Sequence, residues 1–89
     1  MRVIGFGAVW CTVCLVMEPR WREVVKENPW VKLKCYDYDK DKEMVKKYNI
    51  NKNLPIVIFL DKKDREILRL EGEHSKKEIM ELVKKYKNK

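Results

Sequence analysis

The sequence predicts an α/β protein in which a four-stranded mixed sheet is flanked by three helices, in the order β-α-β-α-β-β-α. The chain has 89 residues, the size of one domain, and we expect a single domain over residues 1–89. Short apolar runs alternate with segments whose apolar residues recur every three or four positions. A helix separates the first two strands, so they should be parallel, whereas a tight turn joins the last two into a hairpin.

The predicted elements are a strand over residues 3–6, a helix over 11–27, a strand over 31–38, a short helix ending at 47–48, strands over 54–60 and 66–71, and a last helix after residue 75. The first strand is a continuous apolar run. The first helix contains Pro19, where we expect a kink, and ends at Asn28, because a residue before proline resists the α region. Apolar and polar residues alternate from Val31 to Cys35, so this strand should bury one face.

Capping residues mark the helices of the second half. Asp39 or Asp41 can cap the short helix, and Asn49 suits a left-handed stop. The apolar run that follows predicts a central strand, which a polar turn joins to its returning partner. Ser75 and Glu78 form a capping box before the last helix, whose apolar residues fall on one face and should pack on the sheet.

Composition limits the class of protein and its surroundings. Apolar residues make up 45% of the chain and are spread along it, so disorder is not expected. No apolar run reaches the roughly 18 residues that span a bilayer, and no secretory signal pattern is present, so we expect no membrane partner. Three cysteines are a poor basis for a disulfide-stapled scaffold, which predicts a reducing, cytoplasmic location.

The charge is strongly basic, with 21 Lys and Arg against 14 Asp and Glu. The 16 Lys, 9 Glu and absence of Gln are typical of a thermophile, although an AT-rich genome gives a similar bias. Most of the lysines fit solvated helix faces. Nucleic-acid binding is the second use that such a charge could have, but no aromatic platform or reading motif accompanies it, so a nucleic-acid partner is not expected.

The motif whose side chains could carry out a reaction is Trp10-Cys11-Thr12-Val13-Cys14, at the junction of the first strand and helix. Two cysteines three residues apart at a helix start can close a small disulfide ring. The free N–H groups and the dipole at the helix N-terminus favour a thiolate at Cys11. We therefore predict that Cys11 is the nucleophile and that Cys14, one turn on and more buried, is the resolving thiol.

A zinc site is the alternative use of this cysteine pair. Cys35 and His74 are the best further ligands, yet neither belongs to a second close pair. A C-x-x-C beside a βαβ pattern favours redox chemistry instead. We therefore expect no metal and no organic cofactor, because the electrons would arrive as thiols.

Several features along the chain match one known family. They are the Trp-Cys-x-x-Cys motif after a strand, Pro19 five residues past the second cysteine, Leu54-Pro55 opening a later strand, and Gly72 before the last helix. Together they resemble the thioredoxin family over nearly the whole chain. The resemblance implies a thioredoxin-like fold and a thiol–disulfide oxidoreductase that acts on protein disulfides. A reductase or a glutathione-like thiol would supply the electrons.

The resemblance also implies a substrate surface. It predicts a cis Leu54–Pro55 bond that faces the cysteine pair and leaves the Leu54 backbone free for a substrate strand. The alternative is an ordinary trans proline that begins a strand. Trp10 would border the site; the alternative is a partly buried core aromatic, and both can hold at once. The implied substrate-binding residues are Trp10, Thr12, Val13, Leu54 and Pro55, with the backbone near Gly72 beside them.

Some features depart from the family. The family's usual first strand and helix are absent, so the chain is closer in length to glutaredoxins, and residues 31–38 should form an edge strand. Lys32 and Lys34 would protect that edge from pairing, so we expect a monomer, with an edge-strand homodimer as the alternative. The family's buried aspartate and its lysine partner correspond to Gly5 and Cys35, which removes a proposed proton acceptor for Cys14.

Two questions stay open at the level of sequence. Cys35 is either a small buried hydrophobe beneath the active site or a third redox thiol. The residues between the paired cysteines are Thr12 and Val13, which match neither the Gly-Pro of thioredoxins nor the Pro-Tyr of glutaredoxins. A glutaredoxin-like, glutathione-dependent reductase and a non-catalytic binding module with a structural C-x-x-C therefore stand as alternatives to protein-disulfide exchange.

Overall fold

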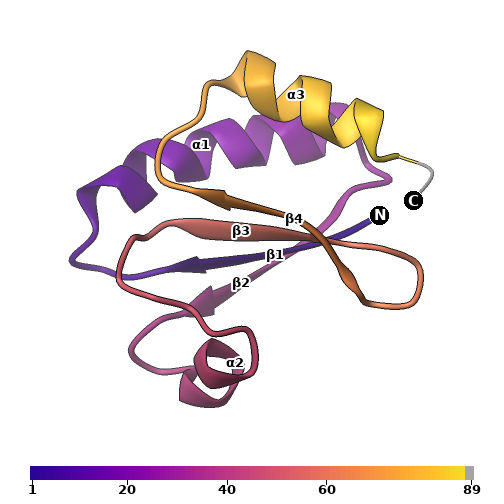
Figure 1. Ribbon diagram of the computed structural model, residues 1–89. Helices are drawn as coiled ribbons and strands as arrows, with labels where there is room; N and C mark the ends of the chain where they lie inside the picture. Colours follow the sequence, from indigo (N-terminus) through magenta and orange to yellow (C-terminus); the bar gives the residue numbers. More distant parts are fainter. Residues whose placement is uncertain (88–89) are drawn as a thin grey trace.

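The computed structural model describes residues 1–87, in which a sheet lies between two helical layers (Figure 1). The strands are β1 (Arg2–Gly7), β2 (Lys32–Asp37), β3 (Ile56–Leu60) and β4 (Glu66–Glu71), and the helices are α1 (Thr12–Glu27), α2 (Lys42–Lys47) and α3 (Lys76–Lys85). Helices α1 and α3 cover one face of the sheet, and α2 covers the other. The predicted α/β class and order of elements are confirmed. Residues 88 and 89 of the predicted domain lie outside the described residues.

The four strands lie in the order β2-β1-β3-β4. The β1–β2 pair is parallel and the β3–β4 pair is antiparallel, as the element order predicts, and the structure adds an antiparallel β1–β3 pair. Strand β2 lies at an edge, which confirms the expectation for residues 31–38. Because β1 is paired on both sides, its last residue, Gly7, leads from the middle of the sheet directly toward α1.

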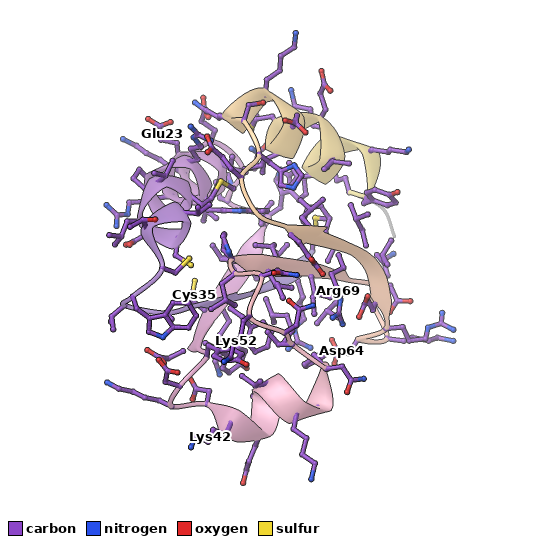
Figure 2. All side chains as sticks on the ribbon, turned by 60° about the vertical axis from the view of Figure 1, so that its left-hand side comes forward. Glu23, Cys35, Lys42, Lys52, Asp64 and Arg69 are labelled. Carbon is purple, nitrogen blue, oxygen red and sulfur yellow. The ribbon has the colours of Figure 1, made fainter. Side chains whose placement is uncertain are left out.

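Apolar clusters on both faces hold this sheet in place. Beneath α1 and α3, the ring of Phe59 lies edge-on to Trp21 at 6.0 Å and to Tyr86 at 6.3 Å. On the α2 side, Phe6 stacks on Tyr36 at 5.4 Å. Every residue of β3 is buried, because its two faces contribute to both clusters. Charged side chains of the helical layers point away from the sheet (Figure 2).

The helix ends follow the predicted chemistry with one exception. The capping box of Ser75 and Glu78 is present, and Asn49 has a φ of 52°. Helix α1 contains Pro19 and ends one residue before Asn28. Asp41 is the N-cap of α2, but its carboxylate does not cap the helix, because it accepts a hydrogen bond from the N–H of the preceding strand's last residue.

Candidate active site

The paired cysteines lie at the junction of β1 and α1. Cys11 is the N-cap of α1, with an extended backbone (φ −96°, ψ 106°). The backbone N–H of Cys14 donates a hydrogen bond to the Cys11 sulfur over 3.3 Å. The Cys11 sulfur therefore lies at the N-terminal end of the helix and accepts from one of its first N–H groups. The expected helix-start position of the pair is therefore present, and both thiols are free.

The burial of the two cysteines is the reverse of the prediction. Cys11 is only 8% exposed, whereas Cys14 is less deeply buried. Cys11 belongs to the apolar cluster on the α2 side of the sheet, which also contains Leu54. Cys14 faces a cavity on the α1 side. The sequence pattern placed both residues on α1 but carried no sign that the N-cap would pack into the opposite cluster.

Cys14 is held as a neutral thiol. Burial and a hydrogen bond to the Cys11 sulfur raise the pKa of Cys14 to about 11. Gly7 permits this close packing, because a Cβ at that position would lie 3.3 Å from the Cys14 sulfur. Near neutral pH, Cys14 therefore carries a proton that it can give up during a reaction.

The Leu54–Pro55 peptide bond is cis, as the resemblance implied. Pro55 lines the same cavity as Cys14, and its carbonyl accepts a hydrogen bond from the Gly72 N–H over 2.9 Å. This bond places the segment before α3 beside Pro55. Leu54 is only 7% exposed, because its side chain packs into the cluster that contains Cys11.

The remaining predicted substrate residues differ in how much of each side chain is exposed to solvent. Trp10 is 52% exposed, Thr12 is exposed, and Val13 is half-buried. Trp10 is fixed in place by contacts that the sequence did not indicate: its ring nitrogen donates to the Asp39 carboxylate over 2.7 Å, and its ring lies edge-on to Tyr38. Sequence reasoning assigned Asp39 only to a helix cap, because nothing local signals a contact between residues so far apart in the chain.

Three further apolar side chains near the cysteine pair are strongly exposed, and sequence reasoning missed them: Val9, Leu15 and Val16. The signal that was available is their position. Val9 precedes the helix, and Leu15 and Val16 fall outside the face of α1 that carries Met17 and Trp21. With Trp10 they place an apolar surface around the start of α1.

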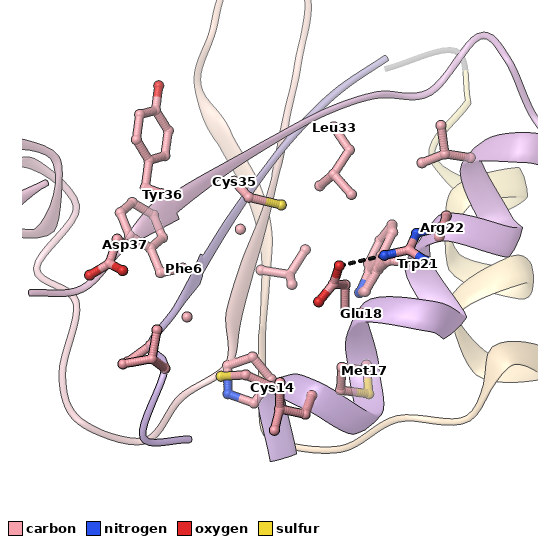
Figure 3. Close-up of a pocket in the computed structure, with 18 residues that line it drawn as sticks. Phe6, Cys14, Met17, Glu18, Trp21, Arg22, Leu33, Cys35, Tyr36 and Asp37 are labelled. Carbon is pink, nitrogen blue, oxygen red and sulfur yellow. Dashed lines mark hydrogen bonds and ion pairs between the residues drawn. The ribbon is translucent and has the colours of Figure 1, made fainter. Parts of the chain in front are cut away.

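A cavity of about 690 Å³ opens between α1 and the β1–β2 side of the sheet (Figure 3). Gly5 and Gly7 leave its floor without side chains, and Cys14 and Cys35 line it from α1 and β2. Neither Gly5 nor Cys35 carries a charge, so these two lining positions contribute no ion pair to the cavity.

Of the two alternatives for Cys35, a fully buried hydrophobe does not match the structure. Cys35 is exposed as a residue, because β2 is an edge strand with an open backbone. Its sulfur nevertheless turns inward and lies 3.9 Å from the position a Gly5 Cβ would take (Figure 3). Burial of the sulfur and the nearby charge of Glu18 raise the pKa of the Cys35 thiol.

The strand order, the cis proline and the cysteine pair at a helix start together define a thioredoxin-like domain with a candidate dithiol. The family model for thioredoxin matches residues 1–85. The chain therefore belongs to the thioredoxin family.

Individual relatives agree with this assignment. Thioredoxin C-3 of Corynebacterium nephridii is 27% identical over 70 residues, which are 79% of this chain and 47% of that protein. The chain thus spans about half the length of this curated relative. The solved thioredoxin of Fasciola hepatica is 27% identical with a TM-score of 0.86, covering 96% of this chain and 79% of that one. Thioredoxin-2 of the malaria parasite is 26% identical with a TM-score of 0.86, covering 94% and 81%.

Two further features of residues 1–87 concern the membrane and the zinc alternative. No helix in this part of the chain has the length and apolar character needed to cross a membrane. No three His, Cys, Asp or Glu side chains of the same residues gather where they could hold a metal ion.

Proposed function

We propose that this protein is a thiol–disulfide oxidoreductase that reduces or exchanges disulfides in protein substrates through Cys11 and Cys14. The observation that carries the proposal is the 3.3 Å hydrogen bond from the Cys14 N–H to the Cys11 sulfur at the N-cap of α1. The two cysteines are three residues apart, one helical turn, and an N–H donor at a helix start is the kind of group that favours a thiolate. Family membership supports the same chemistry.

The reaction runs in two exchanges. The Cys11 thiolate attacks one sulfur of the substrate disulfide, forming a mixed disulfide and releasing the other substrate sulfur as a thiolate. Cys14 then attacks the Cys11 sulfur, the Cys11–Cys14 disulfide forms, and the second substrate sulfur leaves. The substrate gains two electrons and the protein loses two. A reductase or a small glutathione-like thiol returns them.

The proton of Cys14 needs an acceptor in the second exchange. The raised pKa of Cys14 keeps this thiol protonated until the mixed disulfide has formed. Gly5 provides no carboxylate at the cavity floor, so we propose that water in the cavity relays the proton to the departing substrate thiolate. Substrate chains would lie on the predicted surface of Trp10, Thr12, Val13, Leu54 and Pro55. We propose a monomer working in the cytoplasm.

Insulin-disulfide reduction in dithiothreitol tests the activity. We expect Cys11→Ser to reduce the rate to background. In a separate reaction without dithiothreitol, pre-reduced Cys14→Ser should instead accumulate a mixed disulfide with insulin, which peptide mapping should locate on Cys11. Activity that survives in Cys11→Ser would refute the mechanism.

The low exposure of Cys11 makes the assignment of roles a separate question. If Cys11→Ser traps substrate on Cys14 while Cys14→Ser traps none, the nucleophile is Cys14 and the two roles are exchanged. Parallel assays with a glutathione mixed disulfide measure whether a glutaredoxin-like substrate is preferred. A strong preference for it would replace protein disulfides as the substrate class.

A further inference from the structure

The outer edge of β2 is closed at both ends by hydrogen bonds within the chain. At its start, the Val31 N–H donates to the Asn28 carbonyl over 2.9 Å. At its end, the Asp37 N–H donates to the Asp41 carboxylate over 2.7 Å, and the Asp37 carbonyl accepts from the Asp41 N–H over 2.8 Å. A partner strand therefore cannot pair along the whole length of β2.

The middle of this edge is open. The N–H groups of Lys32 and Tyr38 donate toward β1, to the carbonyls of Met1 and Gly7. Successive residues of a strand face opposite sides, so the odd-numbered residues 33 and 35 turn their N–H and C=O groups outward. No hydrogen bond joins these four groups to another residue among those the structure describes. They form a short pairing site of defined register.

The two faces of this open edge differ chemically. On the α1 side, Leu33 and Cys35 line the mouth of the cavity of about 690 Å³. On the α2 side, Lys32 and Lys34 are exposed, and the Lys34 ammonium lies 5.3 Å above the Tyr36 ring. A paired strand would therefore place every second side chain near apolar space and the alternate one near positive charge.

A second copy of this chain does not fit the site. If two β2 edges paired antiparallel through their open groups, Leu33 of each copy would face Cys35 of the other. Lys34 would then lie directly opposite Lys34 of the second copy, in the closer type of cross-strand pair. Like charges in that arrangement are destabilising, so repulsion between the two Lys34 side chains disfavours a homodimer through β2. The same positive charge favours an acidic partner.

We propose that the open edge of β2 is a docking site for an extended segment of another protein with the pattern apolar–acidic–apolar. The two apolar residues lie opposite Leu33 and Cys35 and extend toward the cavity. The acidic residue lies opposite Lys34. Four backbone hydrogen bonds supply affinity, and the alternating side chains supply selectivity. This partner site is distinct from the thiol exchange proposed for Cys11.

The test uses the full reduced chain and two synthetic nine-residue peptides, one with Val-Glu-Val and one with Val-Lys-Val at its centre. We expect the acidic peptide to bind at least about fivefold more tightly and to slow hydrogen exchange at the Leu33 and Cys35 amides, measured by NMR. Lys34→Glu should reverse the preference between the peptides. Lys84→Glu, an exposed substitution on α3, should leave the preference unchanged.

Further measurements distinguish strand pairing at β2 from charge attraction alone and from thiol exchange. Methylating a backbone nitrogen of the peptide that would donate to a β2 carbonyl should abolish binding, because the methyl group replaces the N–H donor and blocks the approach of the strand. Cys11→Ser should bind the acidic peptide as the parent does, since no thiol exchange is involved. The proposal is overturned if the acidic peptide does not bind at millimolar concentration, or if hydrogen exchange slows at amides other than those of Leu33 and Cys35. It is also overturned if Lys34→Glu keeps the parent's preference for the acidic peptide. The same holds if self-association of the protein alone slows exchange at these two amides.

Discussion

The three cysteines have three different environments although they share one small region. Cys11 packs into the cluster on the α2 side, Cys14 faces the cavity from α1, and Cys35 reaches the same cavity from the edge strand. Their reactivities should differ accordingly, because thiol chemistry follows the availability of the thiolate. The distinction depends on which face each sulfur meets rather than on the spacing of the residues.

The raised pKa of Cys14 predicts a dependence of stability on pH. The folded protein holds this proton more tightly than the unfolded chain does, since the pKa rises from 9.0 to about 11. The contribution is complete below about pH 9 and is lost as the pH rises toward 11. Its size is below about 3 kcal/mol, because water at the cavity mouth screens the charge. The melting temperature of the reduced protein, relative to Cys14→Ser, should therefore fall over this range. A constant difference between the two proteins would contradict the prediction.

Cys35 should react slowly with alkylating reagents at neutral pH. Burial of its sulfur and the charge of Glu18 both raise its pKa, so little thiolate is present. Glu18→Gln removes the charge and should speed alkylation of Cys35 by iodoacetamide, followed by peptide-resolved mass spectrometry. The matched control is Glu81→Gln, an exposed carboxylate on α3, which should leave the rate unchanged. Equal rates in the parent and Glu18→Gln would show that this charge has no influence.

At the scale of elements, the end of β1 decides how closely α1 can approach the sheet. Two glycines alternate there on the face that meets α1 and the cavity. Their neighbours differ: a Cβ at Gly7 would press on Cys14, whereas one at Gly5 would meet Cys35, Leu33 and Val57 at 3.9 Å, which is ordinary contact. The same change of residue should therefore have opposite effects at the two positions.

We expect Gly7→Ala to displace Cys14, slow disulfide exchange and lower the melting temperature. Gly5→Ala should keep the exchange rate and stabilise the protein by about 0.4–1 kcal/mol, because alanine lowers the entropy of the unfolded chain. Thermal unfolding and insulin reduction measure both effects. A Gly7→Ala protein with unchanged exchange would show that the Cys14 position tolerates a shift.

At the scale of the whole molecule, Phe59 links the central strand to both helices above it. It is fully buried and contacts Trp21 of α1 and Tyr86 at the end of α3. Phe59→Ala should cost about 3–5 kcal/mol of unfolding free energy, a large part of the roughly 5–15 kcal/mol typical of a domain. Phe59→Leu, which leaves a smaller void, should cost less. Urea denaturation compares them, and equal losses would contradict this packing role.

Local chemistry accounts for much of what could be predicted from the sequence. Ser75 and Glu78 form their capping box because the two groups lie within one turn. Asn49 adopts its left-handed conformation because asparagine tolerates a positive φ after a helix end. The β1–β2 pairing follows from the handedness of a helical crossover. The cis bond at Pro55 was predicted from the family motif, since residues near it do not distinguish cis from trans.

The sequence was enough to predict the order of elements, the parallel β1–β2 pair, the antiparallel β3–β4 pair, and the position of the cysteine pair at the start of α1. These depend on periodicity, turn residues and spacing, which are local along the chain. Long-range packing determines that Cys11 is the more buried thiol, that Asp39 accepts a hydrogen bond from Trp10, and that the Cys35 sulfur faces the cavity from the edge strand. Those outcomes depend on which distant surfaces meet, and pairwise contact between remote segments leaves no periodic signal in either one.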